Sequence, residues 1–455
     1  MPLRTALHSS GLPFTHTGSG LGRALDEFLD SRDVPPLLLG LGEPTHGIEA
    51  FPRFRNQVLR HLVEHRGCRS IAVESDCLAA LAVDEHITGG GGRLEDVLAT
   101  GFSHDFGALA ANRELVGWLR GHNEGRAPRD QVRFHGVDAP IEMSGTESPR
   151  TALTALHRFL ADHLDASALP WPRQTIDSLL GDDAAWNDPA TLMDPARSVG
   201  GSDRARRLRA ITDDLLGVLA AESPGLAAAA SPERLARARL FGRTARGLLR
   251  YHAIMADTAA APGARIARMM GARDAMLAEN LLAVVEAERD RGPSLVFAHN
   301  HRLRRDSSAL RFAGMDVTWW SAGTHAASDL AERYAVIACD LGAAPARGIG
   351  EPAPDTLQGL LHEVTEERAL FPAGPLAAAA DRAPVLVPRT GPLAHQGYLA
   401  LDSVDLGGVD AVAFFADADA DAAPAPAPAP APEPDALPGG RRGSGQTWPN
   451  ASRHS

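Results

Sequence analysis

The sequence predicts an α/β protein with a mostly parallel sheet, helices on its faces, and a helical insertion. Short apolar runs alternate with amphipathic helical segments through the first third of the chain, which is the βαβ pattern of a parallel sheet. Four such runs end in carboxylates or imidazoles. Between the third and fourth runs, residues 150–260 show only helical spacing. We therefore place a helical insertion between the third and fourth strands.

The first strand is predicted at an apolar run over residues 36–41, after a short helix over residues 21–31. The run ends in a turn that carries Glu43 and His46. Polar residues at the end of a buried strand, just before a helix, are where open α/β sheets place their ligands. The alternative is an ordinary turn in which Glu43 or Thr45 caps the next helix.

The next helix, predicted over residues 48–66, has apolar residues at spacings of three and four. Arg55 falls in the middle of this apolar stripe, where a surface arginine would not lie. A buried charge is costly unless it is paired. We therefore expect Arg55 to point at a carboxylate or at an anionic atom of a ligand.

The remaining elements continue the same pattern. Further strands are predicted over residues 70–74, 132–138, 294–298, 316–320, 334–339 and 410–415, and further helices over 76–87, 108–121 and 264–290. The insertion is either a substrate lid or structural padding. The predicted parts are residues 1–149 and 261–416 as two halves of the core, 150–260 as the insertion, and 417–455 as a disordered Ala/Pro-rich tail.

Four predicted strand ends carry titratable side chains: Glu43 with His46, then Glu74, Asp138 and His299. A parallel sheet brings such strand ends to one edge, which predicts a shared site. One histidine could act as a general base oriented by a glutamate. The same side chains could instead hold a zinc-like metal. These positions contain no closely spaced metal-ligand motif, which favours a site without a metal or other cofactor.

The segment His61-Leu62-Val63-Glu64-His65 matches the H-x-x-E-H pattern of some zinc proteases. It closes a short predicted helix between two strands, away from the strand ends that carry the other polar groups. We interpret the match as accidental, because short patterns often match by chance.

Composition excludes several classes of function. The net charge of −12 argues against a general nucleic-acid binder. Every basic residue is arginine, which excludes lysine Schiff-base chemistry and an ordinary P-loop. The three cysteines form no C-x-x-C pair, and neither a G-x-S-x-G turn nor a G-x-G-x-x-G after the first strand is present. Without an apolar signal core or a membrane-length apolar run, we expect a soluble cytoplasmic protein.

Residues 41–47, Leu-Gly-Glu-Pro-Thr-His-Gly, resemble the G-E-x-T-H-G motif of the erythromycin esterase superfamily. Further blocks resemble that family in the same order, over roughly residues 20–416. They are Phe54-Arg55 through Glu74, Trp118 to Arg120 followed by Asn123, Phe134 through Asp138, Arg273-Asp274-Ala275-Met276 with Asn280, Ala298-His299-Asn300, Thr324-His325 to Tyr334, and Asp410-Ala411-Val412.

The resemblance implies hydrolysis of an ester, which in the named family members is the lactone of a macrolide antibiotic. It implies that His46 is the base that activates water. The other positions that match the family's functional residues are Glu43, Glu74, Arg55 and His299. We expect Glu43 or Glu74 to orient His46 and stabilise its imidazolium form. Arg55 and His299 would stabilise the oxyanion or orient Glu74.

One position departs from the family pattern. Members often carry H-N-x-H, whereas here position 302 is Arg and a histidine stands at 301. We expect His301 and Asp138 to contact the substrate, a small-molecule ester or lactone, with Arg302 putting macrolide activity in question. The alternatives are a metal-dependent hydrolase that uses the same cluster, and a non-catalytic family member that binds a small molecule. The oligomeric state is open.

Overall fold

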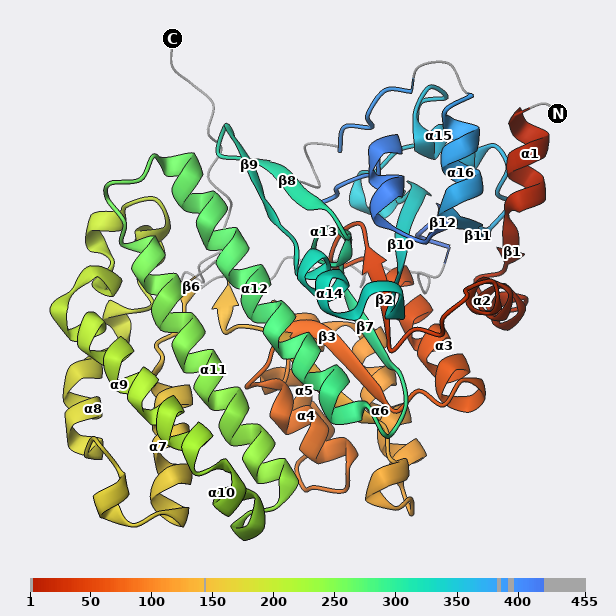
Figure 1. Ribbon diagram of the computed structural model, residues 1–455. Helices are drawn as coiled ribbons and strands as arrows, with labels where there is room; N and C mark the ends of the chain where they lie inside the picture. Colours follow the sequence, from red (N-terminus) through yellow and green to blue (C-terminus); the bar gives the residue numbers. More distant parts are fainter. Residues whose placement is uncertain (1–2, 143–144, 383–385, 392–396, 421–455) are drawn as a thin grey trace, which may run out of the picture. The chain divides into compact units, whose positions relative to one another are not determined.

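An eight-stranded sheet carries the fold (Figure 1). The computed structural model describes residues 3–142, 145–382, 386–391 and 397–420. The sheet has the order β1-β11-β12-β10-β2-β7-β3-β4, and its strands are β1 Leu12–Phe14, β2 Leu38–Glu43, β3 Ser70–Asp76, β4 Arg133–Asp138, β7 Ser294–His299, β10 Tyr334–Ala343, β11 Arg368–Pro372 and β12 Ala411–Asp417. Only the pairings of β11 with β1 and with β12 are antiparallel. The predicted mostly parallel α/β fold is confirmed.

Strand β7 lies between β2 and β3, although it follows both in the chain. The chain runs from β2 through α3 (Ala50–His65) to β3, skipping one position in the sheet, and β7 later fills that position. In the β2–β7 register Glu43 lies opposite His299. Three carboxyl ends therefore adjoin where the strand order reverses, which is where open α/β sheets bind ligands.

Alternate residues of the strands face two separate apolar cores. Leu39, Leu41 and Phe297 face the core formed with α2 (Leu21–Asp30), α3, α4 (Ala80–Ile87), α5 (Leu94–Thr100) and α6 (Ala110–Asn123). Leu38 and Val296 face the other core, formed with α1 (Leu3–Ser10), α12 (Pro262–Glu288), α13 (Asn300–Leu303), α14 (Ala322–Leu330), α15 (Leu357–His362) and α16 (Ala373–Ala380). Burial on both faces explains why the strands are continuous apolar runs.

Glycine is required at one position of β2. A Cβ atom on Gly42 would lie 2.2 Å from Oδ1 of Asn300, the first residue of α13. The Asn300 side chain donates to the carbonyl of Cys339 on β10 at 2.8 Å. Gly42 thus lets the turn after β7 pack directly onto β2 and β10.

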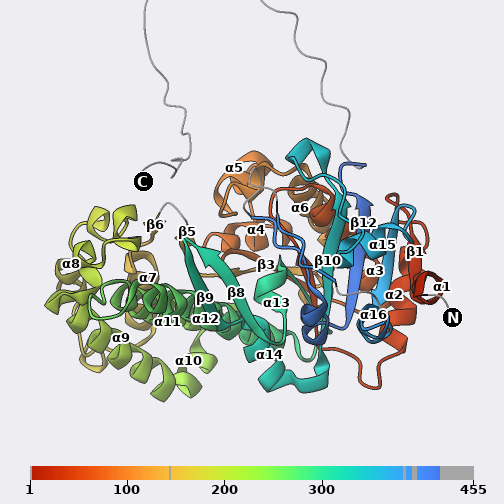
Figure 2. The ribbon, with the colours of Figure 1, turned by 90° about the horizontal axis from the view of Figure 1, so that it is seen from above.

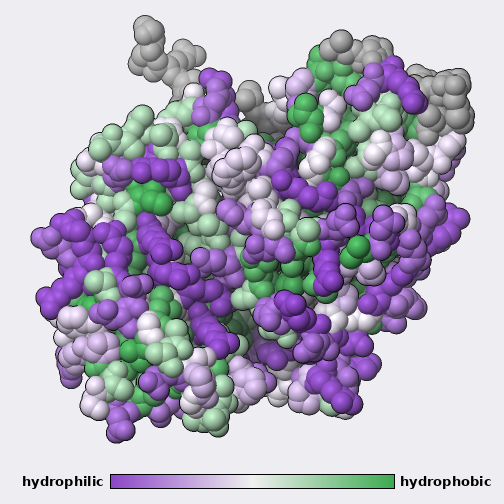
Figure 3. Space-filling view, viewed as in Figure 1, coloured by the Kyte–Doolittle hydropathy of each residue, from purple (hydrophilic) through white to green (hydrophobic). Residues whose placement is uncertain are grey.

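The predicted insertion is a helical layer with its own core. It contains α7 (Arg150–His163), α8 (Arg173–Leu180), α9 (Asp203–Ala221), α10 (Ser223–Ala229) and α11 (Pro232–Met255), which surround buried Leu153, Leu208 and Trp186. Figure 2 shows these helices grouped to one side of the sheet. In Figure 3 hydrophilic side chains predominate over them, with small apolar patches between. The described residues fall in one compact unit that includes the insertion, so the division of the core stays a prediction.

Several elements differ from the sequence predictions. The strand predicted over 316–320 exists as β9 (Met315–Trp320), but it pairs with β8 (Ser307–Phe312) in a separate hairpin. The short strands β1 and β11 and the small hairpin of β5 (Ile141–Glu142) and β6 (Gly145–Thr146) were not predicted. Strand β3 runs to Asp76, so α4 begins later than predicted. Most of the predicted disordered tail lies outside the described residues. No helix within them is both long and apolar enough to span a bilayer.

Candidate active site

The predicted Glu/His cluster forms at the carboxyl ends of β2, β7 and β3. Glu43 and His299 are the last residues of neighbouring strands. The strands β3 and β7 pair only as far as Val73 and Phe297, and beyond that point the carboxylate of Glu74 accepts the backbone N–H of His299 at 2.7 Å. The imidazole rings of His46 and His299 lie 5.4 Å apart. The sheet topology therefore assembles residues that are distant in sequence.

His46 and Glu43 form a hydrogen-bonded pair. Nδ1 of His46 lies 2.7 Å from Oε1 of Glu43, whose side chain is buried, whereas the His46 side chain is 38% exposed. Burial alone would lower the pKa of His46, but the Glu43 carboxylate outweighs it and raises the pKa above its usual value. Burial raises the pKa of Glu43 as well. Nε2 of His46 has no hydrogen-bond partner among the described residues and is free to meet a substrate.

The hydrogen bonds of His299 differ from those of His46. Its Nε2 donates to the carbonyl of Pro44 at 3.1 Å, and its Nδ1 accepts the backbone N–H of His301 at 3.2 Å. Burial lowers the pKa of His299 to about 4, and the nearby His46 adds to this effect. The ring is therefore neutral, with both nitrogens occupied by backbone groups. In this geometry His299 positions the turn after β2 and the start of α13, and it presents no free proton donor to a substrate.

Glu74 is a fixed negative charge in the site. Its Oε1 accepts from Nε of Arg302 at 3.1 Å, and its Oε2 accepts from His299. Burial alone would raise the pKa of Glu74, but the Arg302 guanidinium, with His46 and Arg273, holds it well below its usual range. An ionised Glu74 stabilises the protonated form of His46.

Two arginines, Arg302 and Arg273, pair with buried carboxylates around the site. The sequence analysis did not predict either of them as a site residue. Arg302 also pairs with Asp274 of α12, which accepts from Nε1 of Trp319 at 2.8 Å. Burial raises the pKa of Asp274 to about 6. On the same helix, Arg273 donates through Nε to both oxygens of Asp138, at 2.9 and 3.0 Å. Arg273 lies four residues from Met269 and from Leu277, inside an apolar stripe, which is the signal that singled out Arg55.

Asp138 is fully buried against Arg273, so its predicted contact with substrate stays a prediction. His301 lies on α13, with its ring 5.4 Å from that of His299. Its Nδ1 is buried without a hydrogen-bond partner among the described residues, and burial lowers its pKa well below the usual value. The contact of His301 with the substrate stays a prediction.

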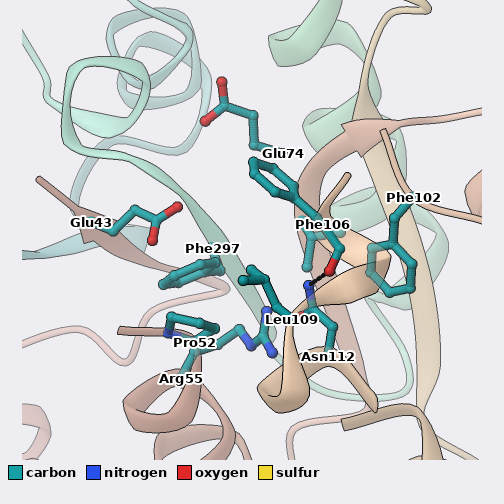
Figure 4. Close-up of a pocket in the computed structure, with 10 residues that line it drawn as sticks. Glu43, Pro52, Arg55, Glu74, Phe102, Phe106, Leu109, Asn112 and Phe297 are labelled. Carbon is teal, nitrogen blue, oxygen red and sulfur yellow. Dashed lines mark hydrogen bonds between the residues drawn. The ribbon is translucent and has the colours of Figure 1, made fainter. Parts of the chain in front are cut away.

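Arg55 is buried in the site and forms no ion pair with a carboxylate of the described residues, so of the two expected partners only an anionic ligand atom stays a prediction. Its Nε and Nη2 donate to Oδ1 of Asn56 at 3.1 and 2.7 Å, and its guanidinium lies 5.0 Å from the centre of the Phe297 ring. It lines a cavity of about 20 Å³ together with Glu43 and Glu74, as Figure 4 shows. Burial lowers the pKa of Arg55 to about 10, while the charge of Glu43 opposes this change. Arg55 thus acts on Glu43 through its charge, without direct contact.

A strained segment closes the other side of the site. His104 and Asp105 both have a φ of 57°, which non-glycine residues rarely adopt and which costs about 1–3 kcal/mol at each residue. This conformation places the Phe106 ring 5.2 Å from the His46 ring and Nε2 of His104 3.3 Å from Nη2 of Arg273. Strain of this kind is concentrated at functional sites. No sequence pattern indicated this segment.

The two histidines of the H-x-x-E-H segment have separate surroundings. His61 binds Asp26, with 2.9 Å between Nε2 and Oδ1, and His65 is exposed. Within the described ranges no three His, Cys, Asp or Glu side chains converge closely enough to hold a metal ion.

A family model described as erythromycin esterase matches residues 63–395. The chain belongs to the erythromycin esterase family. The match includes Glu74, Asp138, Arg273 and His299, and it begins after the Glu43–His46 turn. A search of curated proteins finds no significant match.

Solved structures share the fold of this erythromycin esterase family member at low sequence identity. A protein from Bacillus cereus is 16% identical, with a TM-score of 0.66, covering 91% of this chain and 97% of its own. A succinoglycan biosynthesis protein is 12% identical, with a TM-score of 0.64 and coverage of 91% and 96%. A histidine-to-asparagine mutant of the erythromycin esterase EreC, in its open conformation, is 17% identical, with a TM-score of 0.59 and coverage of 87% and 93%.

Proposed function

We propose that the protein is a hydrolase that cleaves a carboxylic ester or a lactone with water activated by His46. The observation that carries the proposal is the His46–Glu43 pair. A buried carboxylate holds Nδ1 of a half-exposed imidazole, at 2.7 Å, and leaves Nε2 without a partner among the described residues. This is the arrangement a general base requires. Membership of the erythromycin esterase family supports the choice of an ester bond.

The chemistry follows from this geometry. Nε2 of His46 takes a proton from water as the water oxygen adds to the carbonyl carbon. The resulting imidazolium is stabilised by Glu43 and by the negative charge of Glu74. When the tetrahedral intermediate collapses, the C–O bond to the leaving group breaks and His46 returns the proton to the leaving alkoxide. The products are an alcohol and a carboxylic acid, which releases its proton to solvent to become the carboxylate; both groups remain in one molecule when the substrate is a lactone.

The supporting charges are arranged to keep this pair in place. Arg302 pairs with both Glu74 and Asp274, which lowers the cost of burying carboxylates beside the reacting base. Because Arg302 fills the position where family members often carry a second histidine, the substrate is a carboxylic ester or lactone that need not be a macrolide.

The proposal is tested by incubating the protein with macrolides and simple esters and detecting addition of water by mass spectrometry. We expect one substrate class to be converted, and His46→Ala to reduce its turnover by about 10²–10⁴-fold, the usual contribution of a general base. Thermal unfolding of His46→Ala should remain cooperative, at a somewhat lower midpoint than the wild type, because the buried Glu43 carboxylate loses its hydrogen-bond partner. His65→Ala, which removes an exposed histidine, is the matched control.

Near-wild-type turnover by His46→Ala would contradict the assignment of the base. Loss of activity on treatment with a chelator, with recovery on adding a divalent metal, would instead support the metal-dependent alternative. Saturable binding of a tested ester without any product would support a non-catalytic binding protein.

A further inference from the structure

A groove of about 730 Å³ lies between the insertion and the edge of the sheet, apart from the candidate active site. It is lined by the first turns of α11, the last turns of α12, the helix α4 and the first half of the edge strand β4. Figure 1 shows these ends of α11 and α12 meeting near α4. None of Glu43, His46, Glu74 and His299 lines the groove. Its volume is in the range of sites for drug-sized ligands.

The groove has an excess of positive charge in a chain whose net charge is −12. Its lining includes the arginines Arg129, Arg133, Arg237, Arg239, Arg243 and Arg291 and the acids Asp84, Glu233, Glu286 and Glu288. Most of these acids are already paired, Asp84 with Arg133, Glu288 with Arg291, and Glu286 with Arg289 outside the groove. Along α11, arginines therefore remain that pair with no carboxylate of the described residues.

Of these arginines, Arg243 has the best position for binding an anion. Its Nε donates to Oδ1 of Asn280 at 2.6 Å, and Asn280 is itself anchored by donating to the carbonyl of Val137 at 2.9 Å. Arg243 is partly buried and forms no ion pair with any carboxylate of the described residues. Its two terminal amino groups remain to bind an anion in the two-pronged manner typical of arginine and carboxylate or phosphate.

Two further features of the lining favour a ligand. Nε2 of His135 is buried and has no hydrogen-bond partner among the described residues, with Glu288 3.8 Å away. Apolar side chains form much of the wall, namely Ala80, Leu81, Leu240, Ala283, Val284 and Ala287. An apolar wall beside oriented cationic groups suits a molecule with an anionic head and an apolar body.

We infer that this groove is a second binding site, which takes a small amphiphilic anion with its carboxylate or phosphate head on Arg243. The site is separate from the hydrolytic site and does not depend on the proposed function. Octanoate and octyl phosphate are simple probes of the shared chemistry, and octanol is the uncharged control.

The test measures binding to the full chain by titration calorimetry. We expect saturable binding of octanoate or octyl phosphate with a Kd below about 1 mM, and at least about tenfold weaker binding of octanol, because octanol lacks the charge that Arg243 would bind. Arg243→Gln should weaken binding of the anions by about tenfold or more and leave octanol unaffected. Ala236→Trp, at an exposed position of the lining, should block all three by filling the groove.

Arg250→Gln is the matched control, because Arg250 is an exposed arginine of the same helix that does not line the groove. It should bind octanoate as the wild type does. Absence of saturable binding to the wild type would overturn the inference, as would anion binding that Arg243→Gln and Ala236→Trp both leave unchanged. Equal affinity for octanol and octanoate would overturn the anionic head as the recognised feature.

Discussion

His46 lies just after strand β2, and His299 is the last residue of the neighbouring strand β7. The two imidazoles lie at the same end of the sheet, but their surroundings give them different roles. Nδ1 of His46 lies on a buried carboxylate, Nε2 has no partner in the part of the chain that the structure describes, and Glu43 raises the pKa of the ring. His299 has both nitrogens on backbone groups, and burial lowers its pKa to about 4. The comparison shows that the partners of each nitrogen, more than residue type or location, decide which histidine can exchange protons.

The largest effect is expected from removing Arg302, the cation that pairs with Glu74 and Asp274 next to the two histidines. Arg302→Met leaves Glu74 and Asp274 buried without their cation, which should lower the free energy of unfolding by about 3–5 kcal/mol. Because the pKa of Glu74 is depressed in the folded protein, the stabilisation is present above the unfolded-state pKa of about 4.3 and is lost as the pH falls. Urea unfolding should therefore show a large difference at pH 7 that begins to shrink as the pH falls towards 6, where Asp274 takes up a proton, and shrinks further below about pH 4 as Glu74 does so.

Arg311→Met serves as the control for that experiment, since Arg311 pairs with Asp316 at the surface. Exposed ion pairs contribute about 0–1 kcal/mol, so this variant should unfold close to the wild type. An Arg302→Met protein as stable as Arg311→Met would show that the buried pairs do not support the site.

A smaller effect is expected when the positioning histidine is removed. His299→Ala loses the contacts with Pro44 and with the N–H of His301, and should be less stable by about 1–3 kcal/mol in urea unfolding. The acidic limb of kcat/KM against pH should stay where it is in the wild type, because a group with a pKa of about 4 does not set it. A shift of that limb would mean that His299 takes part in proton transfer.

The smallest expected effect is a shift in the pH profile of Glu43→Gln, which tests how Glu43 acts on His46. A base must be unprotonated, so kcat/KM should rise with pH through the raised pKa of His46. Glu43→Gln removes the carboxylate that raises this pKa and leaves the burial that lowers it, so the acidic limb should move to lower pH. An acidic limb that does not move, in a variant that retains measurable turnover, would contradict His46 as the titrating base.

Local patterns predicted much of the fold. The central strands are continuous apolar runs because both faces of the sheet are covered, and the titratable residues at their ends stand out in the sequence. The position of β7 between β2 and β3 was not predictable, because no local pattern records which strands pair. The strand at 316–320 was predicted correctly, yet its pairing with β8 in a separate hairpin could not be.

The sequence analysis placed Glu43, His46, Glu74 and His299 together at the strand ends, and their catalytic roles stay predictions, whereas the charges that pair with them were missed. Arg302 was noticed only as a departure from a family pattern, although it joins Glu74 to Asp274. Arg55 was singled out correctly as buried, but its partners are Asn56 and the Phe297 ring. Such pairings depend on how helices from separate parts of the chain pack, and the positive φ values at His104 and Asp105 depend on the same packing.

The place of β7 in the sheet has a consequence for how the chain acquires its structure during synthesis. The segments that form β2 and β3 emerge from the ribosome first, followed by the whole insertion, and only then by β7. Until β7 arrives, β2 and β3 have no common neighbour and their edges are open to wrong partners. His46 and His299 can meet only after β7, which ends at His299, has paired with β2. We therefore expect the insertion to become compact before the sheet closes and activity to appear last.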